Sequence, residues 1–205
     1  MAKSTTGTDV PSIADIRKRT EEVFGRRPCL WQVEVAQAML RREKDVVCVS
    51  GTGTGKTLTF WMPILFNPGI QIVITPLNVL GAQNTKQLER IGVRAIAISA
   101  ETATEKNFQD IKDGKYRVVT TNPEEALKKK GRFEKLWNDP VFTGKLISVI
   151  SSSSIGESLL GNGAVARLFS SPPDSMQWMR DQRRGALDVI WTAISSMRKS
   201  EICSA

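Results

Sequence analysis

The stretch DVVCVSGTGTGKT, residues 45–57, decides the fold of this chain. Its apolar run Val46–Val49 has the length and the β-branched content of a buried strand. The glycines that follow let the backbone turn sharply and approach a ligand closely. Lys56 and Thr57 then open a predicted helix, whose N-terminal amides and dipole favour an anion. Strand, glycine-rich turn, Lys-Thr and helix in this order predict a phosphate-binding loop.

This loop predicts a site for ATP and Mg²⁺. Lys56 would reach the β- and γ-phosphates, and the Thr57 hydroxyl would bind the metal. The pattern G-x-x-x-x-G-K-[ST] has glycine where this chain has Ser50, and a small residue serves there because the backbone needs only room. The alternative is an ordinary glycine-rich turn, but such turns rarely carry Gly-Lys-Thr in this register. The residues predicted to contact the nucleotide from this loop are Thr52, Gly53, Thr54, Gly55, Lys56 and Thr57.

Composition bounds the class of protein. The chain has 205 residues, enough for one full α/β domain, and a net charge of +8. Six basic and five acidic side chains lie in residues 151–205, so a charge of +7 remains in residues 1–150. A basic surface suits a polyanion such as nucleic acid, and a merely solvated surface is the alternative. With no histidine and three scattered cysteines, we expect no zinc site and an intracellular protein.

Strands and helices alternate up to about residue 150. Residues 1–11 are polar and are expected to be a disordered lead-in without a signal peptide, and no stretch is long enough to span a membrane. Residues 12–150 then predict a three-layer α/β domain with a mainly parallel sheet. The expected helices are 12–24, 31–42, 56–65 and 104–113, and the expected strands are 46–49, 70–75, 94–99, 116–120 and 145–150.

Residues 24–150 resemble the first RecA-like lobe of the superfamily 2 helicases, especially the RecQ-like DNA helicases and their DEAD/DEAH-box relatives. SGTGTGKT is similar to motif I of these proteins, and RPCLWQ, residues 27–32, is similar to their upstream glutamine motif. The resemblance implies that Gln32 reads the adenine edge, which suits an amide that can donate and accept. A glutamine on a helix surface is the alternative. Cys29 stands where RecQ proteins usually carry an arginine.

Two further segments resemble the nucleic-acid loops of these helicases. ITPLNVLGAQ, residues 74–83, is similar to motif Ia, and TTNPEEAL, residues 120–127, is similar to the segment with a Pro-Glu pair. The resemblance implies that these loops contact the nucleic-acid backbone, with DNA favoured over RNA. The implied contact residues are Thr75, Pro76, Leu77, Thr121, Asn122, Pro123 and Glu124. The run Lys128–Arg132 could add phosphate contacts, although such runs are more often simply solvated.

The resemblance stops after the strand KLISVI. The family places an Asp-Glu pair there, for the metal and for the attacking water. This chain has Ser151–Ser154 instead, and Glu157, the nearest carboxylate, follows several residues late. Residues 151–205 are expected to be a divergent, serine-rich tail that is helical, over 174–199, or disordered. A changed reading frame or splice after codon 150 is one hypothesis; finding no helicase-like continuation in the other frames of the coding DNA would refute it.

Three functional classes follow from these observations. The first is the ATP- and nucleic-acid-binding lobe of a helicase, unable to unwind alone because no second lobe follows, and nuclear by family resemblance with the cytoplasm as the alternative. The second is a nucleotide- and DNA-binding module without turnover, or an inactive truncated product. The third, a P-loop kinase or GTPase, is disfavoured because the chain has no Asn-Lys-x-Asp for guanine. The sequence leaves the oligomeric state open.

Overall fold

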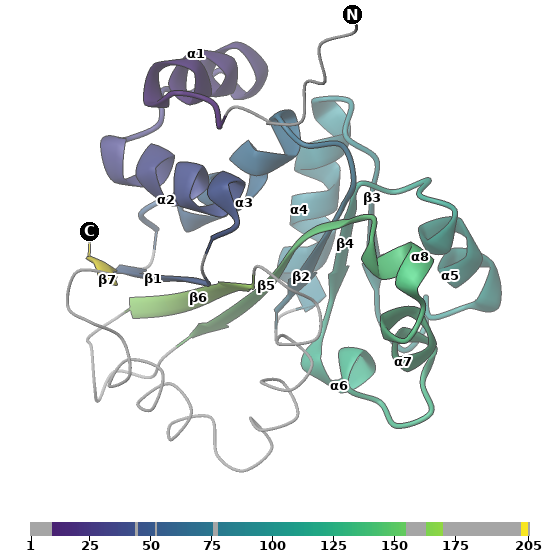
Figure 1. Cartoon of the computed structure of the whole chain (residues 1–205). Coiled ribbons are helices and arrows are strands. Elements are labelled where there is room, and N and C mark those ends of the chain that lie inside the picture. Colours follow the sequence, from purple (N-terminus) through teal and green to yellow (C-terminus); the bar gives the residue numbers. More distant parts are fainter. Residues whose placement is uncertain are drawn as a thin grey trace, which may run out of the picture.

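A computed structural model describes residues 10–43, 45–51, 53–75, 78–154, 163–169 and 202–204. The helices and strands alternate along the chain, as the sequence predicts (Figure 1). The strands are β1 (Val46–Gly51), β2 (Ile70–Ile74), β3 (Ala95–Ile98), β4 (Val118–Thr121), β5 (Leu146–Ser154), β6 (Gly163–Phe169) and β7 (Ile202–Ser204). The helices are α1 (Ile13–Phe24), α2 (Leu30–Arg41), α3 (Lys56–Trp61), the 3₁₀ helix η1 (Met62–Leu65), α4 (Asn78–Arg90), α5 (Glu105–Lys112), α6 (Pro123–Ala126), α7 (Arg132–Trp137) and α8 (Pro140–Thr143).

The strands form one sheet in the order β3-β4-β2-β5-β6-β1-β7. The neighbours β3, β4, β2 and β5 pair in parallel, so their carboxyl ends share one edge. Strand β6 runs antiparallel to both β5 and β1, which places β1 in the same direction as β5. The predicted α/β fold with a mainly parallel sheet is therefore confirmed.

Helices cover both faces of the sheet, which completes three layers. On one face, α2, α3, η1 and α4 pack on a core that includes Phe60, Trp61 and Leu88. On the other face, α5 to α8 pack around Phe108, Phe133 and Phe142. Strand β2 is buried on both faces, as a central parallel strand must be. Figure 1 shows the two helical layers on either side of the sheet.

Sequence-predicted boundaries hold for most elements, with small differences. Ser12 is the N-cap of α1 rather than its first residue, and its hydroxyl accepts from the backbone N–H of Asp15. The predicted helix 56–65 is divided, since α3 ends at Trp61 and continues as η1. Pro63 lies inside η1; it lacks the N–H that an α-helix would need there, so the break is expected.

The tail departs further from the prediction. Strand β5 runs four residues past the predicted end, to Ser154, and the segments 163–169 and 202–204 are strands rather than helical or disordered chain. The physical reason is the sheet: β5 and β1 would otherwise leave unpaired backbone groups at open edges, and β6 pairs with both. The predicted helices within 174–199 lie outside the described residues.

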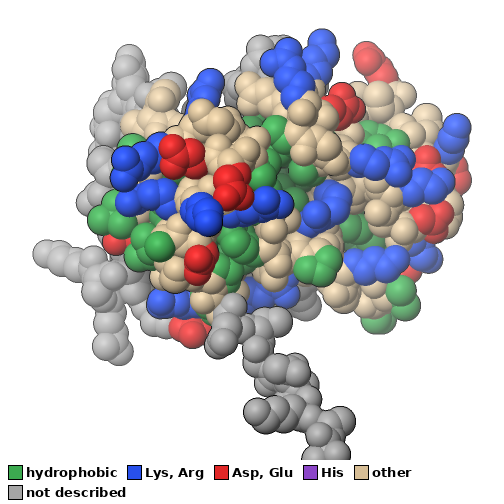
Figure 2. Space-filling view, turned by 90° about the horizontal axis from the view of Figure 1, so that it is seen from above, with side chains coloured by type: hydrophobic (Ala, Val, Ile, Leu, Met, Phe, Trp, Pro, Cys, Tyr) green, Lys and Arg blue, Asp and Glu red, His purple; other side chains and the backbone are tan. Residues whose placement is uncertain are grey.

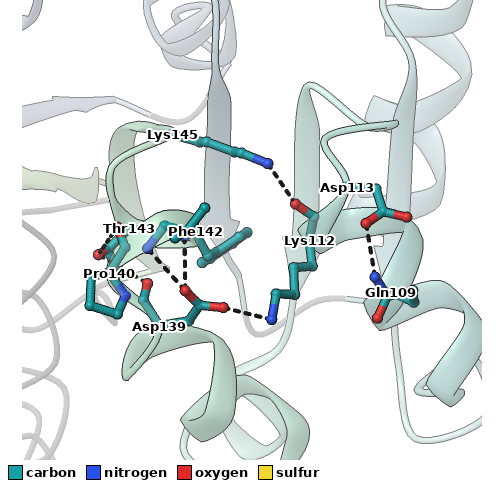
Figure 3. A network of polar contacts seen from close by, with 9 residues as sticks. Gln109, Lys112, Asp113, Asp139, Pro140, Phe142, Thr143 and Lys145 are labelled. Atoms are coloured by element: carbon teal, nitrogen blue, oxygen red, sulfur yellow. Dashed lines mark hydrogen bonds and ion pairs between the residues drawn. The ribbon is translucent and has the colours of Figure 1, made fainter.

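A polar network fastens α5 to the start of α8 and to β5 (Figure 3). Asp139 is the N-cap of α8, and its carboxylate accepts from the backbone N–H of Val141 at 2.9 Å. The same carboxylate lies 2.7 Å from the Lys112 ammonium of α5. Lys145, just before β5, donates to the backbone carbonyl of Lys112 at 2.9 Å. The helical layer is thus tied together at the amino end of β5.

Candidate nucleotide and nucleic-acid site

The phosphate loop connects β1 to α3 as predicted. Strand β1 ends at Gly51, and α3 begins at Lys56, with Gly55 as its N-cap. Gly53 and Gly55 have φ of +83° and +85°, a left-handed conformation that glycine adopts without strain. An added Cβ at Gly53 would meet no atom within 4 Å, so the loop leaves open space there. Thr52 lies outside the described residues.

Lys56 folds back over the loop. Its ammonium donates to the backbone carbonyl of Ser50 at 2.8 Å, across the turn. Partial burial lowers the pKa of this ammonium, while Cys48 acts in the opposite direction. The hydroxyls of Ser50 and Thr54 lie 2.8 Å apart, which closes the loop further. A cation held beside glycine-lined space fits a triphosphate, which would compete with the Ser50 carbonyl for Lys56.

Thr57 is the second residue of α3 and is half-buried next to Lys56. A hydroxyl at this place fits a Mg²⁺ that also binds phosphate oxygens, and the metal would neutralise phosphate charge. Among the described residues, no group of three or more Cys, Asp or Glu side chains could hold a metal by itself.

Gln32 joins the glutamine motif to the phosphate loop. Its side-chain carbonyl accepts from the backbone N–H of Cys29 at 2.8 Å. Its amide donates to the backbone carbonyls of Thr54 at 3.3 Å and Gly55 at 3.1 Å. The side chain is only 5% exposed, and a Cβ at Gly55 would lie 2.7 Å from its amide nitrogen. Gln32 thus fixes the carbonyls of the loop, a role that the sequence analysis missed.

A signal for this contact exists in the sequence. Cys29 is the N-cap of α2 and Gln32 is its third helical residue, which is the spacing of a capping box. A glutamine in that place bonds its own N-cap and is oriented by it, instead of lying free on the helix surface. The partner of its amide, 22 and 23 residues away, is decided by the packing of α2 beside α3.

The two predicted nucleic-acid loops lie side by side. The backbone N–H of Thr75, just after β2, donates to the carbonyl of Thr121 at 2.9 Å. Asn122 is the N-cap of α6, and its side chain accepts from the N–H of Glu125 at 2.8 Å. Pro123 begins α6, and Glu124 is exposed. Pro76 and Leu77 lie outside the described residues.

These loops share the carboxyl edge of the sheet with the phosphate loop, but they are not adjacent to it. In the strand order, β5 and β6 separate β2 from β1. The register pairs Gly51 of β1 with Gly163 and Ser154 of β5 with Ala164. The serines that stand in place of the Asp-Glu pair are therefore one strand removed from the phosphate loop, with β6 between. Glu157 lies outside the described residues.

Comparison with known proteins gives the family. The family model described as DEAD/DEAH box helicase matches residues 30–139, more than half of the chain. The chain is 38% identical over 99 residues to the mouse bifunctional 3'-5' exonuclease/ATP-dependent helicase WRN, covering 48% of this chain and 7% of that protein. It is 27% identical over 157 residues to the mouse ATP-dependent DNA helicase Q1, covering 71% and 24%.

A bacterial relative agrees with these two. The ATP-dependent DNA helicase RecQ of Bacillus subtilis is 27% identical over 96 residues, covering 45% of this chain and 16% of that protein. The chain therefore spans a quarter or less of the length of these relatives. The family model, over residues 30–139, includes the phosphate loop. On the family model and on these RecQ-type relatives, the chain belongs to the DEAD/DEAH box helicases as a RecQ-like N-terminal helicase segment.

Proposed function

We propose that this chain is the ATP- and nucleic-acid-binding lobe of a RecQ-like ATP-dependent DNA helicase and does not unwind DNA by itself. ATP would bind with Mg²⁺ at the phosphate loop, with Lys56 on its phosphates and Thr57 on the metal. Gln32 would read the adenine edge by exchanging a bond that it now makes to the loop. The family and the names of its relatives support an intracellular protein, and the nucleus is the compartment proposed.

DNA would cross the carboxyl edge of the sheet at Thr75 and Thr121–Glu124, together with Pro76 and Leu77. The supporting observation is the contact between the two loops, which makes one continuous surface from two separate stretches of sequence. Relatives named as DNA helicases support DNA over RNA. Among the described residues no helix is long and apolar enough to cross a membrane.

One observation supports the proposed nucleotide site more strongly than any other. Two left-handed glycines precede a lysine that opens α3 and reaches back across the loop to Ser50. Partial burial of the ammonium lowers its pKa at this position. This lysine suits an anion that replaces the carbonyl with charged oxygens.

Equilibrium binding of Mg²⁺–ATP to the whole chain tests the proposal, with Lys56→Ala beside it. We expect binding by the native chain and a loss of at least tenfold in the variant. Lys18→Ala, which removes an exposed charge from α1, is the matched control and should bind as the native chain does. Equal affinity of native chain and Lys56→Ala would refute the proposed site.

A second candidate function is a module that binds ATP and DNA without turnover. It is favoured by Ser151–Ser154, since serine hydroxyls neither carry the charge that the metal attracts nor act as a base at neutral pH. Single-turnover assays with excess chain over radiolabelled ATP separate it from an ATPase. Release of phosphate that Lys56→Ala abolishes would exclude the non-hydrolysing module.

A further inference from the structure

A basic turn follows α6 directly, and we define it as Lys128, Lys129, Lys130, Gly131 and Arg132. It connects α6 to α7 at the bottom of Figure 1, beyond the loop that starts with Asn122. The proposed function does not use it. Two observations distinguish a solvated run of charges from a binding surface. They are the hydrogen bonds of its backbone and the ion pairs of its side chains.

The backbone of the turn is fixed at several points. The N–H of Gly131 donates to the carbonyl of Lys128 at 3.0 Å, and the N–H of Lys130 donates to the Glu134 carboxylate at 2.5 Å. A Cβ at Gly131 would lie 2.7 Å from the Lys128 carbonyl oxygen, so only glycine allows so tight a turn. Lys130 adopts a left-handed φ of +56°, which is uncommon for a side chain of its size.

Three of the nearby carboxylates already have partners. Glu125, with a side chain 12% exposed, pairs with Lys128 at 3.4 Å, and Glu134 accepts the backbone N–H of Lys130. Glu105 pairs with Arg132 at 3.0 Å. Lys129 and Lys130 are exposed, and neither makes an ion pair within the described part of the chain. Among the described residues, no carboxylate therefore neutralises the ammonium groups of Lys129 and Lys130, which lie on a turn with a fixed backbone.

The position of the turn continues the proposed nucleic-acid path. Arg132 also donates to the backbone carbonyl of Ala103 at 2.7 Å, in the loop that follows the carboxyl end of β3. The turn thus bridges the loops after β4 and β3, on the edge that carries Thr75 and Thr121. On the face seen in Figure 2, by contrast, basic side chains are spread out with acidic ones among them.

We propose that the basic turn is a further nucleic-acid contact, in which Lys129 and Lys130 bind backbone phosphates beyond those at Thr75 and Thr121–Glu124. The contact is electrostatic and independent of base sequence, because ammonium groups on a backbone turn neutralise phosphates without reading base edges. The proposal rests on the proposed function, since it extends the same strand of nucleic acid along the same edge.

The test is a salt titration of binding to a fluorescent single-stranded DNA oligonucleotide by the whole chain. The variant Lys129→Ala with Lys130→Asn removes both charges, and asparagine tolerates the left-handed φ at position 130. The control Lys18→Ala with Lys86→Ala removes the same charge from exposed positions on α1 and on the C-terminal half of α4. Unchanged thermal unfolding of both variants confirms that the fold is kept.

We expect the slope of log affinity against log salt to become shallower by about 1.4 in the turn variant, which is two phosphate contacts on a single strand. The control should keep the native slope. Equal slopes in turn variant and control would overturn this inference while leaving the proposed nucleic-acid function intact. No binding by the native chain at low salt would overturn both.

Discussion

At the scale of single residues, the amide of Gln32 orders the phosphate loop, and we propose that it also reads adenine. A free glutamine could both donate and accept at adenine, but here its oxygen bonds Cys29 and its nitrogen bonds the loop at Thr54 and Gly55. A side chain so occupied first fixes the backbone of the phosphate loop at Thr54 and Gly55. To recognise the adenine base, Gln32 would have to break one of these hydrogen bonds.

Replacing Gln32 with alanine should therefore weaken the binding of GTP and inorganic tripolyphosphate by about tenfold, and the binding of ATP by more, because only ATP also loses the proposed adenine contact. The shared part follows because loss of the hydrogen bonds that order the loop, about 1–1.5 kcal/mol, does not depend on the base. Calorimetry with the three ligands measures the effect. A loss confined to ATP would show that Gln32 acts mainly on adenine.

At the scale of secondary-structure elements, Arg117 links the start of β4 to the chain before β2. Its guanidinium donates to the carbonyls of Ile64 at 2.8 Å, Asn67 at 2.5 Å and Gly69 at 3.1 Å. Burial lowers the pKa of this group, yet an arginine remains charged at neutral pH. The end of η1 and the entry into β2 therefore share one side chain as their hydrogen-bond donor.

We expect Arg117→Ala to lower the free energy of unfolding by about 2–3 kcal/mol, because half-buried carbonyls lose a charged donor. Arg117→Lys should lose less, since an ammonium can reach one of the carbonyls but not all three. Urea unfolding of both variants is the measurement. A cost below 0.5 kcal/mol for alanine would mean that water replaces the guanidinium.

The network around Asp139 predicts a dependence of stability on pH. The hydrogen bond from Lys112, helped by the N–H groups of Val141 and Phe142, lowers the pKa of Asp139. A carboxyl whose pKa is lower in the folded chain adds stability above its unfolded pKa, about 3.9, and this stability is lost as the pH falls through the folded value.

Asp139→Asn should therefore be less stable than the native chain at pH 7, and the difference should shrink below about pH 4. Asparagine keeps the helix cap, so the variant isolates the charge. Thermal unfolding between pH 2 and pH 7 measures it, with Asp113→Asn at the C-cap of α5 as a control. A difference that is constant with pH would assign the effect to packing and not to the ion pair.

At the scale of the whole molecule, the strand order separates the phosphate loop from the two proposed nucleic-acid loops. Strand β6 lies between β5 and β1, so Ser151–Ser154 end one strand away from the phosphate loop. Under the proposed function, Ser151–Ser154 would not replace the carboxylates that hydrolysis needs. The proposed nucleic-acid loops follow β2 and β4, on the other side of β5 from β6.

We expect the 205-residue chain to show no ATP-dependent unwinding of a forked DNA duplex, even where it binds the single-stranded arm. Unwinding requires a second lobe that closes on ATP. A strand-displacement assay with a full-length RecQ-type helicase as the positive control measures this. ATP-dependent release of the displaced strand by the chain itself would contradict the prediction.

The sequence by itself determined the α/β class, the five parallel-oriented strands and the phosphate loop, because these depend on local order: apolar runs, glycines and a Lys-Thr pair within 13 residues. It also placed residues 75–77 and 121–124 at the ends of predicted strands, and parallel strands share an edge. The fold class and the positions of these loops agree with the structure, and the family agrees with the matching family model. Their roles in binding stay predictions.

Only the tertiary structure decided three features. The bonds from Gln32 to the phosphate loop span 22 and 23 residues and depend on α2 packing beside α3. The anchoring of the basic turn uses Arg132 and Ala103, 29 residues apart. Strand β6 was not predicted, and it enters the sheet because two open strand edges pair their backbone groups with it. Each is a long-range pairing, which local sequence does not encode.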